Sequence, residues 1–153
     1  MKRPIVDYVL MSVVVTSLVV NTIFINITPP VIKALVYVGL VLLGIGILLL
    51  IIAIVTLRQK GTAKLVDTGI YGIVRHPIYL AAMIMFFSHI FLGQHLVVLV
   101  STAAAIACCY VSMVSGDQQN IEKFGDDYVQ YMKRVPCMNF IAGMARKISS
   151  PEK

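Results

Sequence analysis

Four long apolar runs, separated by short polar segments, dominate this 153-residue sequence. They cover about residues 8–27, 31–57, 77–92 and 96–115, and a polar tail, 116–153, follows them. A helix that crosses the hydrocarbon core of a bilayer needs about 20 apolar residues, and only the third run is short of that length. Charged residues make up 13% of the chain, whereas about a quarter is usual in a soluble domain. We therefore expect an all-α, polytopic membrane protein with four transmembrane helices.

The second apolar run contains three glycines, Gly39, Gly44 and Gly46. Small residues let two membrane helices approach closely, so we expect these glycines to face a neighbouring helix. They do not form a dinucleotide-binding loop, because the sequence lacks both the GxGxxG spacing and a preceding strand. The whole chain, residues 1–153, is expected to form a single membrane-embedded domain.

The basic residues are distributed very unevenly between the polar segments. Of the thirteen Lys and Arg, Lys33 alone lies in a turn on one side of the four expected helices. The other twelve are Lys2, Arg3, Arg58, Lys60, Lys64, Arg75, Lys123, Lys133, Arg134, Arg146, Lys147 and Lys153. Because cytoplasmic segments of membrane proteins are enriched in Lys and Arg, we expect both termini, the middle loop and a helical C-terminal segment in the cytoplasm.

This topology also accounts for the net charge of +6, and no basic patch is interleaved with exposed aromatic residues as nucleic-acid binding would require. Cys108 and Cys109 are adjacent in an apolar run, and Cys137 is alone in the tail. No Cys/His spacing resembles a metal site, so we expect neither a metal nor a nucleic-acid partner. His89 and His95 lie near an expected outer turn, where structural or interfacial roles are expected.

The end of the middle loop, residues 69–80 (GIYGIVRHPIYL), carries more hydrogen-bonding groups than a membrane turn requires. Pro77 suits the first turn of a helix, where its missing N–H costs nothing. Arg75 and His76 are therefore expected at the N-terminus of the third helix, facing the headgroups, with Tyr79 just inside. Arg and Tyr at an interface can also simply anchor a helix, and that structural interpretation stays open.

The first part of the tail, residues 116–136, has a helical pattern. Apolar and aromatic residues recur there at steps of three and four: Ile121, Phe124, Tyr128, Tyr131 and Val135. The pattern predicts a helical segment with one aromatic face. Such a segment can rest on the membrane surface, or its rings and the nearby Asp117 and Glu122 can hold a cation.

Two segments together resemble a known family. Residues 64–80 (KLVDTGIYGIVRHPIYL) are similar to the LVxxGxYxxVRHPxYxG signature of the isoprenylcysteine carboxyl methyltransferase and phospholipid methyltransferase superfamily. Residues 124–136 (FGDDYVQYMKRVP) are similar to its second signature, FGxxYxxYxxxVP. The two segments stand in the family's order with a predicted helical hairpin between them. The first two apolar runs carry no signature of that superfamily.

The resemblance implies a membrane-embedded enzyme that uses S-adenosylmethionine at the cytoplasmic face. A lipophilic substrate would reach the methyl group from the bilayer. By position, the resemblance implies catalytic roles for Arg75, His76 and Tyr79. The residues that it implies for cofactor binding are Leu65, Val66, Gly69, Tyr71, His76, Tyr79, Asp117, Tyr128, Tyr131 and Arg134.

The sequence departs from the superfamily at one place. Members usually carry a pair of Glu beginning eight residues before the Phe of the second signature, where this chain has Gly116 and Asp117. One carboxylate is therefore missing and the other is shorter by a methylene. The departure concerns the contact that holds a polar end of the cofactor.

The expected function is S-adenosylmethionine-dependent methyl transfer to a prenylated cysteine carboxylate or a phospholipid amine. The reaction requires alignment, exclusion of water and, for an ammonium or thiol acceptor, removal of a proton, but no metal. One alternative is a non-catalytic tetraspan membrane scaffold that retains the methyltransferase fold. Another, a sterol-reductase-like oxidoreductase, would need a longer chain and a site for the phosphates of a nicotinamide cofactor.

Overall fold

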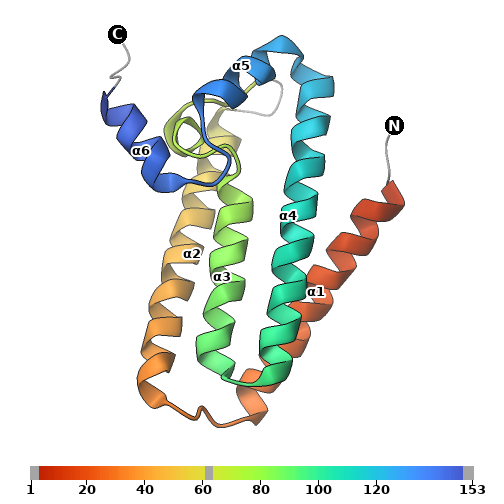
Figure 1. Ribbon diagram of the computed structural model, residues 1–153, viewed down its shortest axis with the longest axis vertical. Helices are drawn as coiled ribbons and strands as arrows, with labels where there is room; N and C mark the ends of the chain where they lie inside the picture. Colours follow the sequence, from red (N-terminus) through yellow and green to blue (C-terminus); the bar gives the residue numbers. More distant parts are fainter. Residues whose placement is uncertain (1–3, 61–63, 150–153) are drawn as a thin grey trace.

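The computed structural model describes residues 4–60 and 64–149, and all the regular structure in these residues is helical (Figure 1). The elements are α1 (Pro4–Ile27), α2 (Lys33–Lys60), the 3-10 turn η1 (Gly69–Gly72), α3 (Pro77–Gly93), α4 (Leu96–Phe124), α5 (Asp126–Arg134) and α6 (Phe140–Ser149). The first four α-helices run side by side, while α5 and α6 sit at the end of the bundle where α3 begins. The all-α expectation is confirmed for the described residues.

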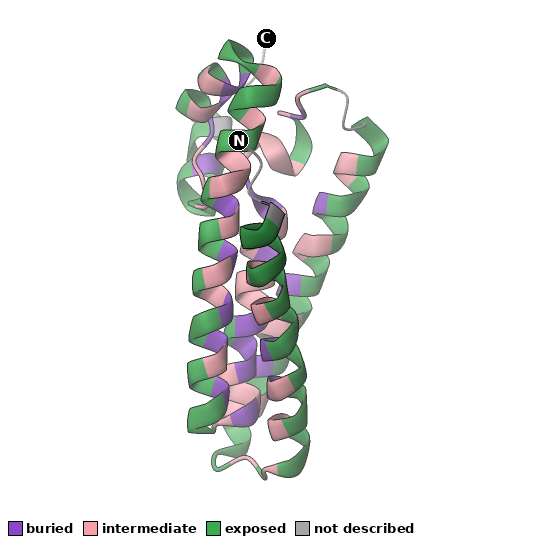
Figure 2. Cartoon of the chain, turned by 90° about the vertical axis from the view of Figure 1, so that its right-hand side faces the viewer, coloured by how far each residue is buried: buried purple, intermediate pink, exposed green. Residues whose placement is uncertain are grey.

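Three helices, α1, α2 and α4, are long and apolar enough to cross a membrane, whereas α3 is a shorter apolar helix. Large apolar side chains are exposed along their outer faces, and the buried residues lie where helices meet (Figure 2). A surface of this kind is stable against lipid and unstable in water. The chain is therefore an integral membrane protein.

The helix ends differ from the sequence prediction at one important place. α4 continues past residue 115 to Phe124, so the first residues of the predicted polar tail extend the membrane helix. The helical segment predicted within 116–136 is broken at Gly125, whose φ of 59° is a conformation that glycine adopts without strain. Ile121 is consequently on an exposed surface, while Tyr128 and Tyr131 are buried on α5.

The two glycines that pack α2 against α3 are Gly39 and Gly46. A Cβ built on Gly46 would lie 2.5 Å from Cγ of Met85 and 3.2 Å from the carbonyl oxygen of Ala81, and one on Gly39 would lie 2.8 Å from the side chain of Leu92. The prediction of close packing is right for these two residues. It is wrong for Gly44, which has open space where a side chain would be, because it lies on another face of α2.

A buried polar cluster joins α1 to α3 and α4. The Asn21 side chain donates to Oγ1 of Thr102 at 3.0 Å and lies 3.2 Å from Nδ1 of His89. The Ser101 hydroxyl donates to the Asn21 carbonyl oxygen. His89 is therefore a buried helix-packing residue, whereas His95 caps the N-terminus of α4 by accepting a hydrogen bond from the backbone N–H of Val97.

The N-terminal end of α1, the C-terminal end of α2, α5 and α6 all lie at one end of the bundle (Figure 1). The α1–α2 turn and the α3–α4 turn lie at the other end, and Lys33 is the first residue of α2 after the first of these turns. The Gln94 side chain joins the two turns by accepting a hydrogen bond from the N–H of Ile32. The described basic residues thus divide between the two ends as the charge pattern predicts. Lys2, Arg3 and Lys153 lie outside the described residues.

Candidate functional site

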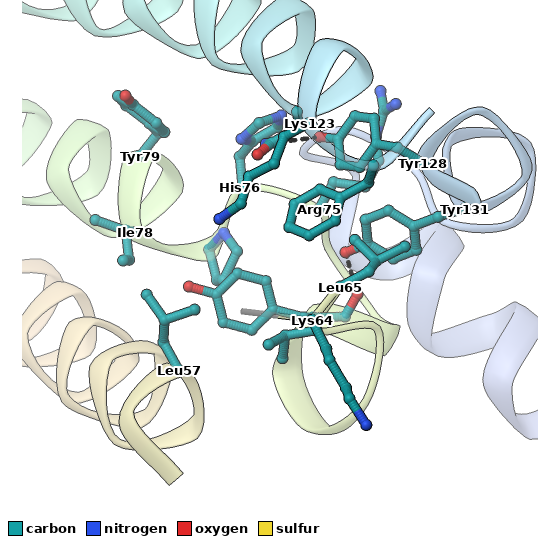
Figure 3. A pocket seen from close by; sticks show the side chains of 15 residues that line it. Leu57, Lys64, Leu65, Arg75, His76, Ile78, Tyr79, Lys123, Tyr128 and Tyr131 are labelled. Atoms are coloured by element: carbon teal, nitrogen blue, oxygen red, sulfur yellow. Dashed lines mark hydrogen bonds between the residues drawn. The ribbon is translucent and has the colours of Figure 1, made fainter. Parts of the chain in front are cut away.

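A cavity of about 300 Å³ lies at the end of the bundle where α3 begins (Figure 3). Its wall combines the end of α2, the loop before α3, the first turn of α3, the end of α4 and one face of α5. The lining residues are Leu57, Lys64, Leu65, Val66, Tyr71, Arg75, His76, Pro77, Ile78, Tyr79, Asn120, Lys123, Phe124, Tyr128 and Tyr131. Small-molecule sites begin at about this volume.

The cavity collects most of the residues singled out from the sequence. Eight of the eleven line it: Leu65, Val66, Tyr71, Arg75, His76, Tyr79, Tyr128 and Tyr131. The other three do not. Gly69 lies outside it, with a φ of 62° that suits the η1 turn, and Arg134 pairs with Asp67 at 3.4 Å on an exposed surface. Asp117 lies behind the wall and holds lining residues from there.

The carboxylate of Asp117 links three parts of the chain. Its Oδ1 lies 2.7 Å from Nε2 of His76 and accepts a hydrogen bond of 2.5 Å from the Tyr128 hydroxyl. Its Oδ2 lies 3.7 Å from Nη2 of Arg75. This single side chain on α4 therefore fixes the loop before α3 and the face of α5 against each other. The Asn120 amide adds a bond of 3.4 Å to the same Tyr128 hydroxyl.

Arg75 is the least satisfied polar residue of the site. Its side chain is 10% exposed, and its Nε and Nη1 are buried with no hydrogen-bond partner among the described residues. A buried, charged donor without a partner costs about 1–3 kcal/mol or more. Of the described residues that line the cavity, Lys64, Arg75 and Lys123 are basic and none is acidic. The arrangement favours a ligand that carries an anionic group.

His76 precedes α3 directly and is 7% exposed. Because the Asp117 carboxylate can only accept, the proton lies on Nε2 of a neutral His76, which leaves Nδ1 as an acceptor. Burial lowers the pKa of His76 below its ordinary value, and the Arg75 guanidinium acts in the same direction, while Asp117 partly opposes both. The lowered pKa favours the neutral imidazole, whose Nδ1 carries a lone pair.

Tyrosines close the cavity on the α5 side. The Tyr131 hydroxyl donates to the carbonyl oxygen of Tyr71 at 2.6 Å, and the rings of Tyr128 and Tyr131 are 5.6 Å apart. Burial raises the pKa of all three tyrosines, so their hydroxyls stay protonated donors. A backbone bond of 3.1 Å from the N–H of Arg75 to the carbonyl of Pro136 holds the end of α5 to the loop.

Sequence reasoning missed seven lining residues: Leu57, Lys64, Pro77, Ile78, Asn120, Lys123 and Phe124. The last three lie on the part of α4 that was predicted to be tail. Asp117, Asn120 and Phe124 are spaced by three and four residues, which places them on one face of a continuous helix. If the fourth apolar run is extended through these positions, the spacing identifies Asn120 and Phe124 as neighbours of Asp117 on one helix face.

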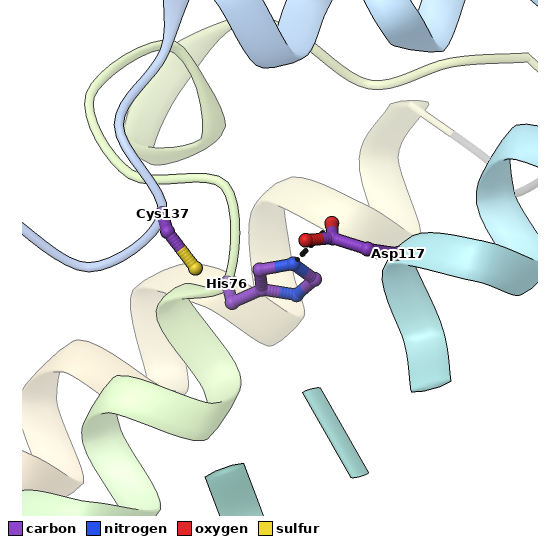
Figure 4. Close-up of side chains that lie close together, drawn as sticks. All are labelled: His76, Asp117 and Cys137. Carbon is purple, nitrogen blue, oxygen red and sulfur yellow. Dashed lines mark hydrogen bonds and ion pairs between the residues drawn. The ribbon is translucent and has the colours of Figure 1, made fainter. Parts of the chain in front are cut away.

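His76, Asp117 and Cys137 bring potential metal ligands within 4.8 Å of one another (Figure 4). His76 and Asp117 already bond to each other, and the Cys137 thiol lies 3.5 Å from the sulfur of Met113. The guanidinium of Arg75 beside Asp117 repels a dication at this place. The position of Arg75 thus disfavours a metal ion at this cluster.

The fold and the cavity define a helical integral membrane protein with a basic, tyrosine-lined pocket at one end of its bundle. Residues 2–135 match the family described as "Protein of unknown function (DUF1295)", and the chain belongs to that family. The match covers the bundle and α5 and ends before α6. No curated protein and no solved structure matches the chain.

Proposed function

We propose that this protein is an S-adenosylmethionine-dependent methyltransferase that acts on a lipophilic membrane substrate, a prenylated cysteine carboxylate or a phospholipid amine. The observation that carries the proposal is the composition of the cavity. Residues 64–80 and 124–136, which resemble the two signatures of the isoprenylcysteine carboxyl and phospholipid methyltransferase superfamily, both contribute to its lining. Segments far apart in the sequence thus meet at one small-molecule site.

The chemistry of the cavity fits the proposed cofactor. S-adenosylmethionine has a carboxylate, and Arg75 presents two buried donor nitrogens without partners. A guanidinium forms short, charge-assisted hydrogen bonds to a carboxylate. Tyr128 and Tyr131 provide aromatic faces, which attract positively charged groups such as a sulfonium. Arg75, Tyr128 and Tyr131 would hold the cofactor, with Leu65 and Val66 along its side.

When bound, S-adenosylmethionine supplies a methyl group on a sulfonium, which reacts by in-line displacement without a metal. For an ammonium acceptor, Nδ1 of His76 would accept the proton, while Asp117 holds the imidazole in the required tautomer. A carboxylate acceptor needs no such step. Leu57 and Ile78, at the α2–α3 side of the cavity, form the apolar wall along which a lipid chain would approach (Figure 3).

The proposal includes an orientation. The helical C-terminal segment, both termini and the site would face the cytoplasm, with α3 as the fourth transmembrane helix, because Lys and Arg gather at that end. Labelling of cysteines introduced at Gln94 and at Asp126, in cells and in lysed cells, tests it. Labelling of residue 126 from outside, or of both residues from one side, would contradict this orientation.

The decisive experiment is calorimetry of the purified protein with S-adenosylmethionine, followed by mass spectrometry for membrane lipids that gain a methyl group. Binding and turnover are the expected results, and Arg58→Gln, an exposed residue at the end of α2, serves as a control for charge. A well-folded protein that shows no binding would exclude the proposal.

A second candidate, the non-catalytic tetraspan scaffold, is favoured by one observation. The Asp117 carboxylate already has two hydrogen bonds and an ion pair, and Gly116 offers no second carboxylate. The acceptor for the amine of the cofactor would then be missing. Binding without methyl transfer to any lipid would favour this scaffold over the enzyme.

A further inference from the structure

We propose that α6 docks through its apolar face on the headgroup region of an anionic bilayer. Its apolar face carries three exposed side chains. Ile141 is 81% exposed, Ile148 is 74% exposed and Met144 is 40% exposed. The spacing of three and four residues puts all three on one side of the helix. A helix with such a face, and no other element packed on it among the described residues, lies stably at a membrane interface.

The position of α6 in the fold puts it at the level of the interface. Gly143 packs directly on the carbonyl oxygen of Ile73, where a Cβ would come within 1.9 Å. Ile73 lies just before α3, whose 17 residues span about 25 Å, close to the thickness of the hydrocarbon core. The loop before α3 must therefore lie near the boundary between acyl chains and headgroups. α6 stands beside this loop (Figure 1).

The charge of α6 identifies the lipid. Residues 137–149 contain Arg146 and Lys147 and no Asp or Glu. Arg146 is exposed, and its Nη1 also donates to the carbonyl of Lys133 at 3.3 Å, which holds α6 to the end of α5. Basic residues beside an interfacial helix attract anionic headgroups. A zwitterionic bilayer could bind the apolar face of α6, but it would leave the charges of Arg146 and Lys147 without counterions.

A second copy of the chain is a poorer occupant of this face. A helix of ten residues is about 15 Å long, whereas a stable interface buries about 800 Å² on each partner. Two copies would also bring like charges together. The membrane in which α1, α2 and α4 are embedded is already present at the right distance.

The chain contains no Trp, so a single introduced Trp reports on α6 without background. We would place Ile141→Trp on the apolar face and, as a matched control, Ala142→Trp at the next, exposed position away from it. The full chain is reconstituted in phosphatidylcholine, with or without phosphatidylglycerol, containing lipids brominated high on the acyl chain. We expect blue-shifted emission and strong quenching for Ile141→Trp, and at least a twofold weaker quenching for Ala142→Trp.

Phosphatidylglycerol should increase the quenching of Ile141→Trp, and the added changes Arg146→Gln and Lys147→Gln should abolish this increase. Equal quenching at both positions, or none at Ile141→Trp, would overturn the docking. Equal quenching with and without phosphatidylglycerol would overturn the preference for anionic lipid. A blue shift that occurs without bromine quenching and disappears when the protein is diluted would mean that this face contacts a second copy of the chain. None of these measurements depends on the cofactor or on turnover.

Discussion

Arg75 reaches Asp117 with one guanidinium nitrogen, at 3.7 Å, while Nε and Nη1 of the same side chain stay buried without hydrogen-bond partners. Asp117 has more hydrogen-bond partners, because His76 and Tyr128 both bond to its Oδ1. The pair is therefore asymmetric: the carboxylate is satisfied and the cation is not. Such an arrangement lowers the stability of the ligand-free protein.

The first prediction follows from this asymmetry. Arg75→Met removes a buried charge with two unpaired donors, so thermal unfolding of the ligand-free protein should occur at the same temperature as in the parent, or higher. Affinity for S-adenosylmethionine should fall tenfold to a hundredfold, which corresponds to about 1.5–3 kcal/mol for hydrogen bonds to a charged group. Calorimetry and thermal unfolding check both parts, with Arg58→Gln as the control. A less stable variant with normal affinity would show that Arg75 is only structural.

The second prediction concerns pH. Burial holds the pKa of His76 below its ordinary value of about 6.5, so near that pH the unfolded chain binds a proton that the folded chain does not. The contribution of His76 to stability should therefore be constant above about pH 6.5 and decrease as the pH falls below it. His76→Gln keeps a donor for Asp117 but does not titrate. The melting temperature of this variant should therefore fall less steeply as the pH is lowered. Melting temperatures between pH 5 and 8 check this. An unchanged slope in the variant would refute it.

The third prediction tests the α2–α3 packing. Gly46→Val puts a branched side chain where even a Cβ would meet Met85 and the Ala81 carbonyl, so it should cost about 1–3 kcal/mol of unfolding free energy. Gly44→Val is the matched control on the same helix, since nothing lies within 4 Å of the added carbon. Unfolding in detergent with increasing denaturant measures both. Equal effects of the two changes would mean that α2 packs on α3 by another face.

The fourth prediction concerns the polar cluster inside the bundle. Asn21→Leu leaves Ser101, Thr102 and His89 without their shared partner, and should cost about 0.6–1.7 kcal/mol, the range of single hydrogen bonds between membrane helices. Asn26→Leu is the control, because Asn26 is exposed on the same helix and its side chain donates to the backbone carbonyl of Thr22 in α1. The difference in unfolding free energy between the two variants is the measurement. No difference would mean that α1 is held by apolar packing alone.

Hydropathy by itself predicted the helices of the bundle, because a helix that crosses the lipid bilayer needs a run of apolar residues, whichever helices pack beside it. The four predicted runs correspond to α1–α4, and Pro77 begins α3 as its fixed φ predicts. The clustering of Arg75, His76 and Tyr79 with Tyr128 and Tyr131 was also predictable, since two recognisable segments flank one helical hairpin.

What the sequence left open depends on contacts between distant residues. The extension of α4 to Phe124 was hidden because polar residues end a hydropathy run without ending a helix. The tertiary structure decided that Asp117 stands behind the cavity wall, that Gly44 faces open space and that Nε and Nη1 of Arg75 lack hydrogen-bond partners. It also decided that Gly143 sets α6 against Ile73. Local pattern determines where helices form, whereas the direction in which each side chain points toward its neighbours is set by how the helices pack.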